Sequence, residues 1–189
     1  MKEFSGKRAL ITGGATGIGK ALAIALAREG MDIVIASTNK GRLDAAAEAI
    51  RASVEGVTVQ TVVCDVADRK AVFAMAKEVG PIDLLCANAG VTTTGTYLEH
   101  RDEDYDWIFG VVLYGVTNCI QAFYPAMVER GSGHILLTGS QTAFSPDWFL
   151  GHGPYVAAKA AVHALAFQLR PEAAQHGVGV SLVMPAYTG

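Results

Sequence analysis

Tyr155 and Lys159 stand four residues apart in the sequence Y-V-A-A-K, and their side chains are of the types that form an acid–base pair. On a helix this spacing places the phenol and the ammonium on one face, about one turn apart. A free tyrosine, with a pKa of about 10, exchanges protons poorly at neutral pH, and a neighbouring cation lowers that pKa. The pair is therefore a candidate general acid or base. An amphipathic helix with a half-buried tyrosine and a solvated lysine fits the same short pattern.

A second chemical signal is the glycine-rich stretch T-G-G-A-T-G-I-G at residues 12–19, which follows an apolar run and precedes a strongly helical one. Strand, glycine turn and helix in that order predict dinucleotide binding. Gly13 permits a tight turn, Gly17 lets a pyrophosphate approach the backbone, and Gly19 lets the helix pack closely on the strand. The helix N-terminus adds free amides and a partial positive charge.

Three further motifs accompany these two signals: C-D-V around Asp65, N-A-G at residues 88–90, and L-T-G-S ending at Ser140. Together they resemble the short-chain dehydrogenase/reductase family over essentially the whole chain. The resemblance implies hydride transfer between a nicotinamide and the carbonyl or secondary alcohol carbon of a small molecule. It implies that Tyr155 passes the proton and that Lys159 lowers the tyrosine pKa and binds the nicotinamide ribose. Ser140 is implied to hold the substrate oxygen.

The same resemblance assigns the cofactor-binding residues. They lie in the glycine loop, at the end of the second predicted strand, in the C-D-V and N-A-G motifs, on the catalytic helix and after the last strand. These residues are Gly13, Thr16, Gly17, Ile18, Gly19, Ser37, Thr38, Asn39, Asp65, Val66, Asn88, Ala89, Gly90, Tyr155, Lys159, Pro185 and Thr188.

The choice between NADP and NAD depends on the end of the second predicted strand. A carboxylate there holds the adenosine ribose diol and repels a 2′-phosphate, which selects NAD. Ser37 takes that place here, with Lys40 and Arg42 shortly after it, so NADP is favoured. Thr16 stands where NADP users often have a basic residue, and the two cations also fit as solvated residues of the next helix. NAD therefore stays open.

Strand and helix alternate from end to end, which predicts one doubly wound α/β domain over residues 1–189. The expected strands are 9–12, 32–37, 57–63, 82–87, 134–138 and 178–184. The expected helices are 20–28, 40–52, 69–79 and two long ones at about 104–130 and 154–176. Right-handed crossovers arrange these elements as a three-layer α/β/α Rossmann domain with parallel strand order 3-2-1-4-5-6. The candidate site residues then converge at the carboxyl ends of the strands.

Composition agrees with this class. Hydrophobic residues make up 51% of the chain and charged residues 17%, which suits parallel strands buried on both faces. The net charge of −3 predicts no nucleic-acid surface. We expect no membrane span, because no apolar run approaches roughly 20 residues, and a cytoplasmic location, because no secretory segment is evident. The three cysteines, without C-x-x-C spacing, are expected to be free thiols rather than metal ligands.

Three positions depart from the pattern of the family. Val112, in V-V-L-Y-G, stands where members usually have an asparagine, which is associated with a helix distortion and a proton-relay water. Ala186 replaces the usual glycine after Pro185, and the chain ends at Gly189, before the usual substrate-covering segment. These departures keep open a nucleotide-binding regulatory protein that has lost turnover. The intact catalytic residues favour the enzyme, and nothing positive indicates an isomerase or dehydratase.

Large apolar residues between and beside the catalytic motifs bear on the identity of the substrate. In one interpretation they line an apolar pocket, and in the other they pack against a lid or another subunit. The residues concerned are Tyr97, Phe144, Trp148, Phe149 and Leu150. The stretch D-Y-D-W-I-F-G-V-V-L-Y-G-V resembles a branch of the family that acts on bulky aromatic alcohols. The two long helices resemble those that pair between subunits, so a homodimer or homotetramer is expected.

Overall fold

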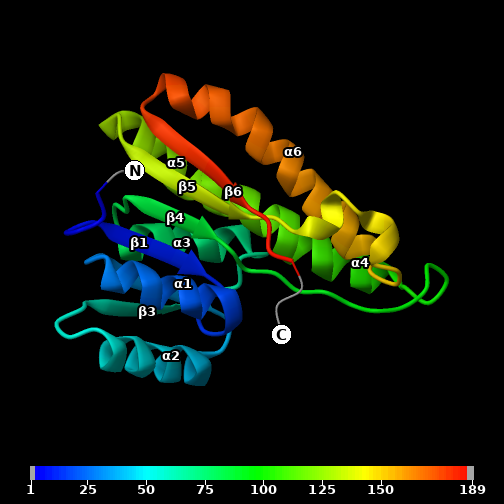
Figure 1. Cartoon of the computed structure of the whole chain (residues 1–189), viewed down its shortest axis with the longest axis horizontal. Helices are drawn as coiled ribbons and strands as arrows, with labels where there is room; N and C mark the ends of the chain where they lie inside the picture. Colours follow the sequence, from blue (N-terminus) through cyan, green and yellow to red (C-terminus); the bar gives the residue numbers. More distant parts are fainter. Residues whose placement is uncertain (1–2, 187–189) are drawn as a thin grey trace.

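Six parallel strands, rich in Val, Ile, Leu and Ala, form one sheet in the order β3-β2-β1-β4-β5-β6 (Figure 1). Such side chains pack well on a pleated surface that helices cover. The computed structural model describes residues 3–186, apart from the side chain of Trp148. The strands are β1 (Arg8–Thr12), β2 (Asp32–Ser37), β3 (Val59–Val63), β4 (Leu84–Ala87), β5 (Gly133–Thr138) and β6 (Val178–Val183).

Helices connect consecutive strands, as parallel pairing requires. They are α1 (Gly17–Arg28), α2 (Lys40–Ser53), α3 (Arg69–Val79), α4 (Asp102–Ile108), α5 (Gly115–Arg130) and α6 (Gly153–Gln175). A π-helical segment, η1 (Phe109–Tyr114), joins α4 to α5, and two 3-10 turns, η2 (Gln141–Ala143) and η3 (Pro146–Trp148), lie between β5 and α6.

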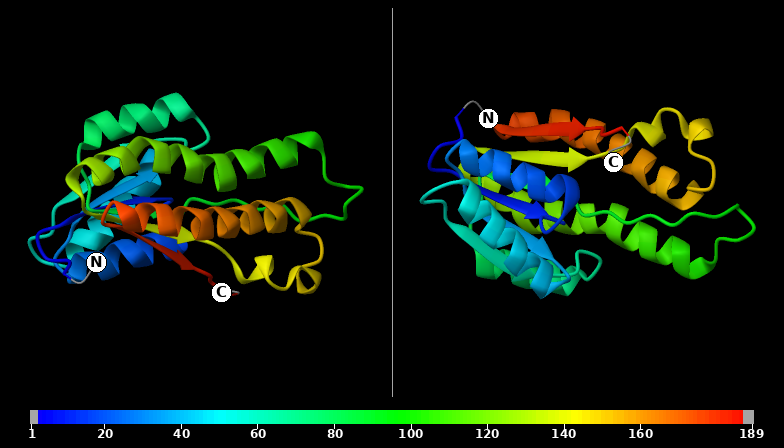
Figure 2. Two further views of the ribbon diagram at one scale, coloured as in Figure 1. Left: turned by 90° about the horizontal axis from the view of Figure 1, so that it is seen from above. Right: turned by 60° about the horizontal axis from the view of Figure 1, so that its bottom comes forward.

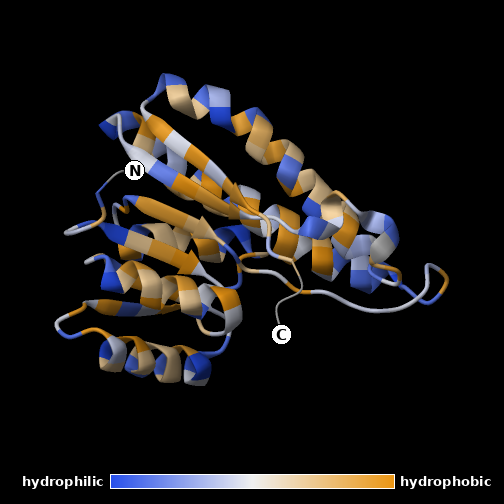
Figure 3. Ribbon diagram, viewed as in Figure 1, coloured by the Kyte–Doolittle hydropathy of each residue, from blue (hydrophilic) through white to orange (hydrophobic). Residues whose placement is uncertain are grey.

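The helices form a layer on each side of the sheet (Figure 2). Alternation along β1 sends Leu10 to one face and Ile11 to the other. Leu10 joins Leu85 in the core beneath α3, α5 and α6, whereas Ile11 joins Ile35 and Leu43 in the core with α1 and α2. Figure 3 shows the resulting concentration of hydrophobic residues in the strands. The predicted α/β class, layers and strand order are confirmed.

The predicted element ends differ from the structure by one to three residues at five strands and four helices. β3 begins at Val59 rather than residue 57, β4 begins at Leu84 rather than 82, and β6 ends at Val183 rather than 184. The helix predicted at 104–130 begins at Asp102 and is divided by η1. The prediction of one uninterrupted helix is wrong because apolar periodicity does not distinguish a π-helical turn from an α-helical one.

Close packing against the loop after β3 accompanies the π-helical segment. A Cβ at Gly115 would lie 2.6 Å from Cγ2 of Val66, so glycine allows the helix to approach this loop. One turn further, Nδ2 of Asn118 donates a hydrogen bond of 2.9 Å to the carbonyl oxygen of Val66. Val112 is fully buried within η1. The helix distortion expected with asparagine is thus present with valine.

The continuous helical run from α4 through α5, residues 102–130, is long and apolar enough to cross a bilayer by length and composition. It is the one such run in the described part of the chain. Of its most apolar window, 44% is buried inside the protein, and core helices of globular proteins meet the same criterion. The length and composition of this run are therefore weak evidence that it spans a membrane.

Candidate functional site

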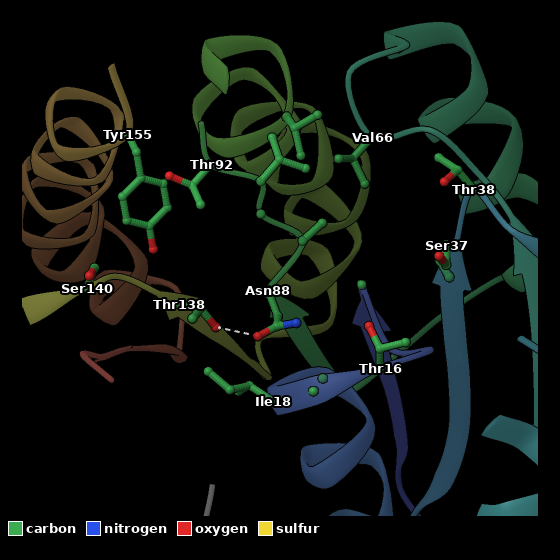
Figure 4. Close-up of a pocket in the computed structure, with 18 of the residues that line it drawn as sticks. Thr16, Ile18, Ser37, Thr38, Val66, Asn88, Thr92, Thr138, Ser140 and Tyr155 are labelled. Carbon is green, nitrogen blue, oxygen red and sulfur yellow. Dashed lines mark hydrogen bonds between the residues drawn. The ribbon is translucent and has the colours of Figure 1, made fainter. Parts of the chain in front are cut away.

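A cleft of about 640 Å³ opens at the carboxyl ends of the strands (Figure 4). It gathers nearly all of the predicted site residues, which come from segments far apart in the sequence. Those that line it are Gly13, Thr16, Gly17, Ile18, Gly19, Ser37, Thr38, Asp65, Val66, Asn88, Ala89, Gly90, Ser140, Tyr155, Lys159 and Pro185. Asn39 does not line it, and Thr188 lies outside the described residues.

The glycine loop has the backbone that its sequence predicts. Gly13 and Gly17 have φ angles of +65° and +50°, a region that favours glycine. A Cβ at Gly19 would lie 2.2 Å from the carbonyl oxygen of Gly13, so the loop closes tightly on the first turn of α1. A Cβ at Gly17 would meet open space, which leaves the backbone there accessible from the cleft. The loop and the helix N-terminus form a cradle that fits a pyrophosphate.

Asn88 forms hydrogen bonds that connect the ends of three strands at the floor of the cleft. Its Nδ2 donates to the carbonyl oxygen of Thr12 at 3.1 Å, and its backbone N–H donates to the Thr12 hydroxyl at 3.0 Å. Its Oδ1 accepts a hydrogen bond of 3.2 Å from the Thr138 hydroxyl, which Figure 4 marks with a dashed line. These contacts join β1, β4 and β5. Thr12 and Thr138 were not predicted as site residues, since each reads as the last residue of an apolar strand.

The end of β2 offers hydroxyls and one cation to the cleft. Ser37 and Thr38 line it, and so does Arg42. Asn39 instead caps α2 by accepting a hydrogen bond of 2.9 Å from the backbone N–H of Arg42, which explains its place outside the cleft. Lys40 forms an ion pair of 2.8 Å with Asp44 along α2. Of the two cations noted in the sequence, Arg42 alone lines the cleft.

Asp65 provides the one carboxylate among the described residues that line the cleft. Its Oδ1 accepts a hydrogen bond of 2.9 Å from the backbone N–H of Ala67, which shapes the turn after β3. The turn carries Val66, the residue against which Gly115 packs. The acidic residue of the C-D-V motif therefore has a structural role in addition to the predicted place in the cofactor cleft.

The three predicted catalytic residues meet at the far end of the cleft from Arg42. Ser140 follows β5, and Tyr155 and Lys159 lie on α6. The Ser140 hydroxyl oxygen accepts hydrogen bonds from the backbone N–H of Thr142 at 3.2 Å and from its hydroxyl at 3.0 Å. In Figure 4 the hydroxyl of Tyr155 points toward the end of β5, where Ser140 and Thr138 lie. Thr142 was not predicted, because nothing in its spacing distinguishes it from a turn residue.

Lys159 is buried at 3% exposure and donates a hydrogen bond of 2.6 Å to the carbonyl oxygen of Thr138. Burial lowers the pKa of Lys159 to about 8. Its Nζ lies 5.7 Å from the centroid of the Tyr155 ring, as the four-residue spacing predicts. The solvated lysine of the alternative interpretation is thereby overturned, since the ammonium faces the cleft and the tyrosine.

Burial acts on Tyr155 in the direction opposite to the effect expected of Lys159. Burial raises the pKa of Tyr155 above its ordinary value, and the hydrogen bond with Ser140 acts in the opposite direction but less strongly. Desolvation disfavours the phenolate. The spacing of the two residues reveals their common face but not how deeply α6 buries them. The phenol is therefore protonated at neutral pH.

Other side chains complete the wall near Tyr155. Trp107 and Val111, which were not predicted as site residues, line the cleft together with Val91 and Thr92. His152 contacts the chain behind this wall through hydrogen bonds. Its Nδ1 lies 3.2 Å from the Thr92 hydroxyl and 3.0 Å from the carbonyl oxygen of Thr93. His152 thus packs against the loop after β4 and does not line the cleft.

Four of the five large apolar residues considered for a substrate pocket do not line the cleft. Tyr97, Phe144 and Leu150 are exposed, at 79%, 60% and 83%, and do not line the cleft. Phe149 does not line it either, and the side chain of Trp148 lies outside the described residues. Phe144, Phe149 and Leu150 belong to the segment with η2 and η3 that leads from β5 to α6, whereas Tyr97 lies between β4 and α4.

Among the described residues, no three His, Cys, Asp or Glu side chains lie close enough together to hold a metal ion. The three cysteines, Cys64, Cys86 and Cys119, are free and buried. Burial raises the pKa of Cys64 to about 11 and that of Cys86 to about 12. Thiols in this state are neutral and poorly reactive.

Comparison with known proteins identifies relatives of this sequence. The sequence model of a family described as short chain dehydrogenase matches residues 7–189. A C alpha-dehydrogenase from Sphingobium sp. strain SYK-6 is 36% identical over 98% of this chain, which spans 62% of that protein. A glycine betaine reductase from Emericella nidulans is 36% identical over 98% of this chain, which spans 15% of that protein.

Two solved structures extend the comparison to bound nucleotides. A short chain dehydrogenase/reductase from Burkholderia phymatum in complex with NAD is 35% identical, with a TM-score of 0.93 over 100% of this chain and 68% of that one. A metagenomic short-chain oxidoreductase in complex with NADP is 32% identical, with a TM-score of 0.90 over 96% of this chain and 83% of that one. Structures similar to this chain therefore hold either nucleotide.

Proposed function

The chain belongs to the short-chain dehydrogenase/reductase family, and from this membership we propose that it is an oxidoreductase that interconverts a carbonyl and a secondary alcohol. The observation that carries the proposal is the meeting of Ser140, Tyr155 and Lys159 at one end of a cleft that also contains the phosphate cradle of the glycine loop. A bound nicotinamide nucleotide supplies or takes up the hydride. The protein holds the reactants and moves the proton.

Tyr155 holds the proton that a carbonyl oxygen takes up on reduction. Because burial keeps its phenol protonated at neutral pH, the residue is ready to donate. Lys159, with a pKa of about 8, is mostly cationic at pH 7 and stabilises the phenolate that remains after the proton has left. Ser140 accepts two hydrogen bonds from Thr142, so its own hydroxyl hydrogen remains to be donated, to the Tyr155 oxygen in this structure and to the substrate oxygen once substrate binds.

NADP is the proposed cofactor. Ser37 and Thr38 replace the carboxylate that would repel a 2′-phosphate, and the guanidinium of Arg42 is available at this end of the cleft. An arginine suits a phosphate because its planar fork donates two hydrogen bonds at once. The pairing of Lys40 with Asp44 leaves Arg42 as the cation on which this proposal rests.

The proposed substrate is a bulky or aromatic ketone or alcohol. Trp107, Val91 and Val111 give the cleft an apolar wall on the side of Tyr155, and apolar walls favour apolar substrates. The similarity to a C alpha-dehydrogenase supports an alcohol at a carbon next to a larger group.

A homodimer is proposed through the long helices. Tyr114 on η1 and Phe167 on α6, two segments that pack together, are more than half exposed. Large apolar side chains grouped on neighbouring helices are typical of a surface that another subunit covers.

The test combines nucleotide binding with turnover. NADPH and NADH are titrated separately by fluorescence, and a panel of acetophenone, cyclohexanone and ethyl acetoacetate is then screened with each nucleotide. We expect NADPH-dependent reduction that Tyr155→Phe lowers at least 1,000-fold while NADPH binding changes less than threefold. Binding without turnover on an enlarged panel would favour the regulatory alternative, and binding of neither nucleotide would refute both.

A further inference from the structure

His163 lies one turn beyond Lys159 on α6, on the side of Ser140 that faces the protein interior rather than the cleft. Its side chain is 5% exposed and is not among the residues that line the cleft. The backbone N–H of Ser140 donates a hydrogen bond of 3.2 Å to its Nε2. The histidine thus holds the main chain of a predicted catalytic residue that is 23 positions away in the sequence.

The imidazole fits closely between the chain after β5 and a neighbouring ring. A Cβ at Gly139 would lie 2.3 Å from Nε2 of His163, so the absence of a side chain at residue 139 lets the ring reach Ser140. On the other side, the Phe144 ring lies 5.0 Å from the imidazole, centroid to centroid, at an angle of 59°. These contacts confine the ring to the orientation in which Nε2 faces the backbone N–H.

The hydrogen bond determines the protonation state of the ring. Nε2 accepts a hydrogen, so it carries none, and the proton of the neutral imidazole lies on Nδ1. Nδ1 is buried without a hydrogen-bond partner among the described residues. Burial and, to a smaller extent, the charge of Lys159 lower the pKa of His163. The residues that enclose the ring from outside α6, Gly139 and Phe144, are uncharged, so Lys159 is the charged group that acts on it.

We propose that neutral His163 is a positioning residue, which fixes the backbone of Ser140 and so aims the serine hydroxyl at the substrate oxygen. The inference rests on the proposed function. Ser140 is held at its hydroxyl oxygen by Thr142 and at its backbone by His163. Without the second contact, the buried N–H is left unpaired and the segment after β5 shifts to find another partner. A displacement of this kind lowers the rate by misplacing the hydroxyl rather than by weakening cofactor binding.

Three substitutions at residue 163 separate this role from general packing. The amide oxygen of Gln reaches about as far from Cβ as Nε2 of His, whereas that of Asn reaches only about as far as Nδ1. His163→Gln therefore keeps an acceptor for Ser140, and His163→Asn and His163→Leu do not. We expect kcat for reduction of the best ketone of the panel with NADPH to stay within about threefold in His163→Gln. It falls about tenfold in the other two variants, with the KM for NADPH unchanged in all three.

A double-mutant cycle with Ser140→Ala gives the decisive comparison. If His163 acts through the serine hydroxyl, His163→Leu lowers kcat about tenfold in the wild type and less than twofold when residue 140 is alanine. Equal losses in both backgrounds would refute the proposal and leave a structural role. Thermal unfolding and NADPH titration of each variant identify losses that come from misfolding.

The pH profile provides a measurement that does not depend on the folding of the Leu and Asn variants. Protonation of His163 would place two donors opposite each other at Nε2 and the Ser140 N–H. We expect kcat of the wild type to fall at acid pH, below the ordinary pKa range of histidine, and His163→Gln, which cannot be protonated, to lack this decrease. The same decrease in both proteins would overturn the proposal. A wild type without turnover would refute the proposed function instead, whereas turnover that is indifferent to residue 163 refutes only this inference.

Discussion

At the scale of single residues, burial decides the chemistry of the site as much as residue type does. Lys159 lies on the same helix face as Tyr155, yet its strongest contact is the carbonyl oxygen of Thr138. Burial lowers the pKa of Lys159 and raises that of Tyr155, so both groups are pushed toward their neutral forms. The tyrosine is therefore prepared to give a proton rather than to take one.

The raised pKa of Tyr155 predicts opposite pH profiles for the two directions of reaction. Carbonyl reduction needs the phenol and the Lys159 ammonium, so its kcat/KM is flat near pH 6–7 and falls as pH rises through about 8, where Lys159 loses its charge, and further through the tyrosine pKa. Alcohol oxidation needs the phenolate, and its kcat/KM rises about tenfold per pH unit below that pKa. Initial rates in both directions from pH 6 to 10.5 check this. Oxidation that is independent of pH between 7 and 9 would contradict it.

Arg42 is expected to distinguish NADPH from NADH. Arg42→Ala removes the cation nearest to a 2′-phosphate, so the Kd for NADPH rises about tenfold and that for NADH changes less than twofold. Lys40→Ala is the matched control, since Lys40 is already paired with Asp44 and should affect neither Kd by more than twofold. Fluorescence titration measures all four values. An equal loss for both nucleotides in Arg42→Ala would count against the assignment of NADP.

We expect the buried charge of Lys159 to lower the free energy of unfolding of the protein without bound nucleotide. Its pKa of about 8 lies below the ordinary value of 10.5, so the folded state binds the proton less tightly than the unfolded state does. The free energy of unfolding therefore rises as pH increases from about 8 to about 10.5. Lys159→Met removes the buried charge, and we expect it to raise that free energy by about 1–3 kcal/mol at pH 7.

Urea unfolding of wild type and Lys159→Met at pH 7 and pH 10 measures this effect. The difference in unfolding free energy shrinks as pH rises from about 8 to 10, because the wild-type lysine loses its proton in the folded state at about pH 8. A variant that is less stable than the wild type at pH 7 would show that the hydrogen bond to Thr138 outweighs the cost of burial.

At the scale of elements, two glycines set how closely helices approach the loops that carry the site. Gly19 brings the first turn of α1 against the glycine loop, and Gly115 brings the start of α5 against the turn after β3. The first follows from the spacing of the glycines, and the second depends on a tertiary contact with Val66. The π-helical segment before Gly115 belongs to this second contact region.

Gly115→Ala is expected to lower the free energy of unfolding by about 1–3 kcal/mol. The new Cβ would lie 2.6 Å from Cγ2 of Val66, a stiff β-branched side chain with little freedom to move. Gly110→Ala, within the π-helical segment, is the control, because its Cβ would lie at an ordinary 3.5 Å from Cβ of Ala67. Chemical denaturation of both variants checks the contrast. Equal decreases in the free energy of unfolding at the two positions would show that packing against the loop does not determine the decrease.

At the scale of the whole molecule, the sheet brings five separated motifs to one edge, and the long helices α5 and α6 lie side by side on one face of it (Figure 2). Parallel strands place all their carboxyl ends at that edge, which is why the cleft forms there. The outer surfaces of α6 and η1 carry Phe167 and Tyr114, both more than half exposed. The arrangement separates a catalytic edge from an apolar helical face.

Phe167→Asp is expected to convert a dimer into a monomer. A carboxylate buried at the centre of an apolar interface weakens association at least 100-fold. Light scattering after size exclusion measures the mass of both proteins. Leu150→Asp, at a residue that is 83% exposed on the loop before α6, is the control and keeps the mass of the wild type. A wild type that is already monomeric at 50 µM would contradict the proposed dimer.

The amino-acid sequence by itself determined the strand order, the glycine loop and the common face of Tyr155 and Lys159. These features depend on local periodicity, on glycine backbone preferences and on the handedness of crossovers, all of which act over short stretches. The tertiary structure alone decided that Arg42 rather than Lys40 lines the cleft, that Trp107 forms its wall and that His163 holds Ser140. Such contacts join side chains that are distant in the sequence. How deeply each of these side chains is buried, and therefore the pKa of Tyr155, is decided only when the helix layers pack on the sheet.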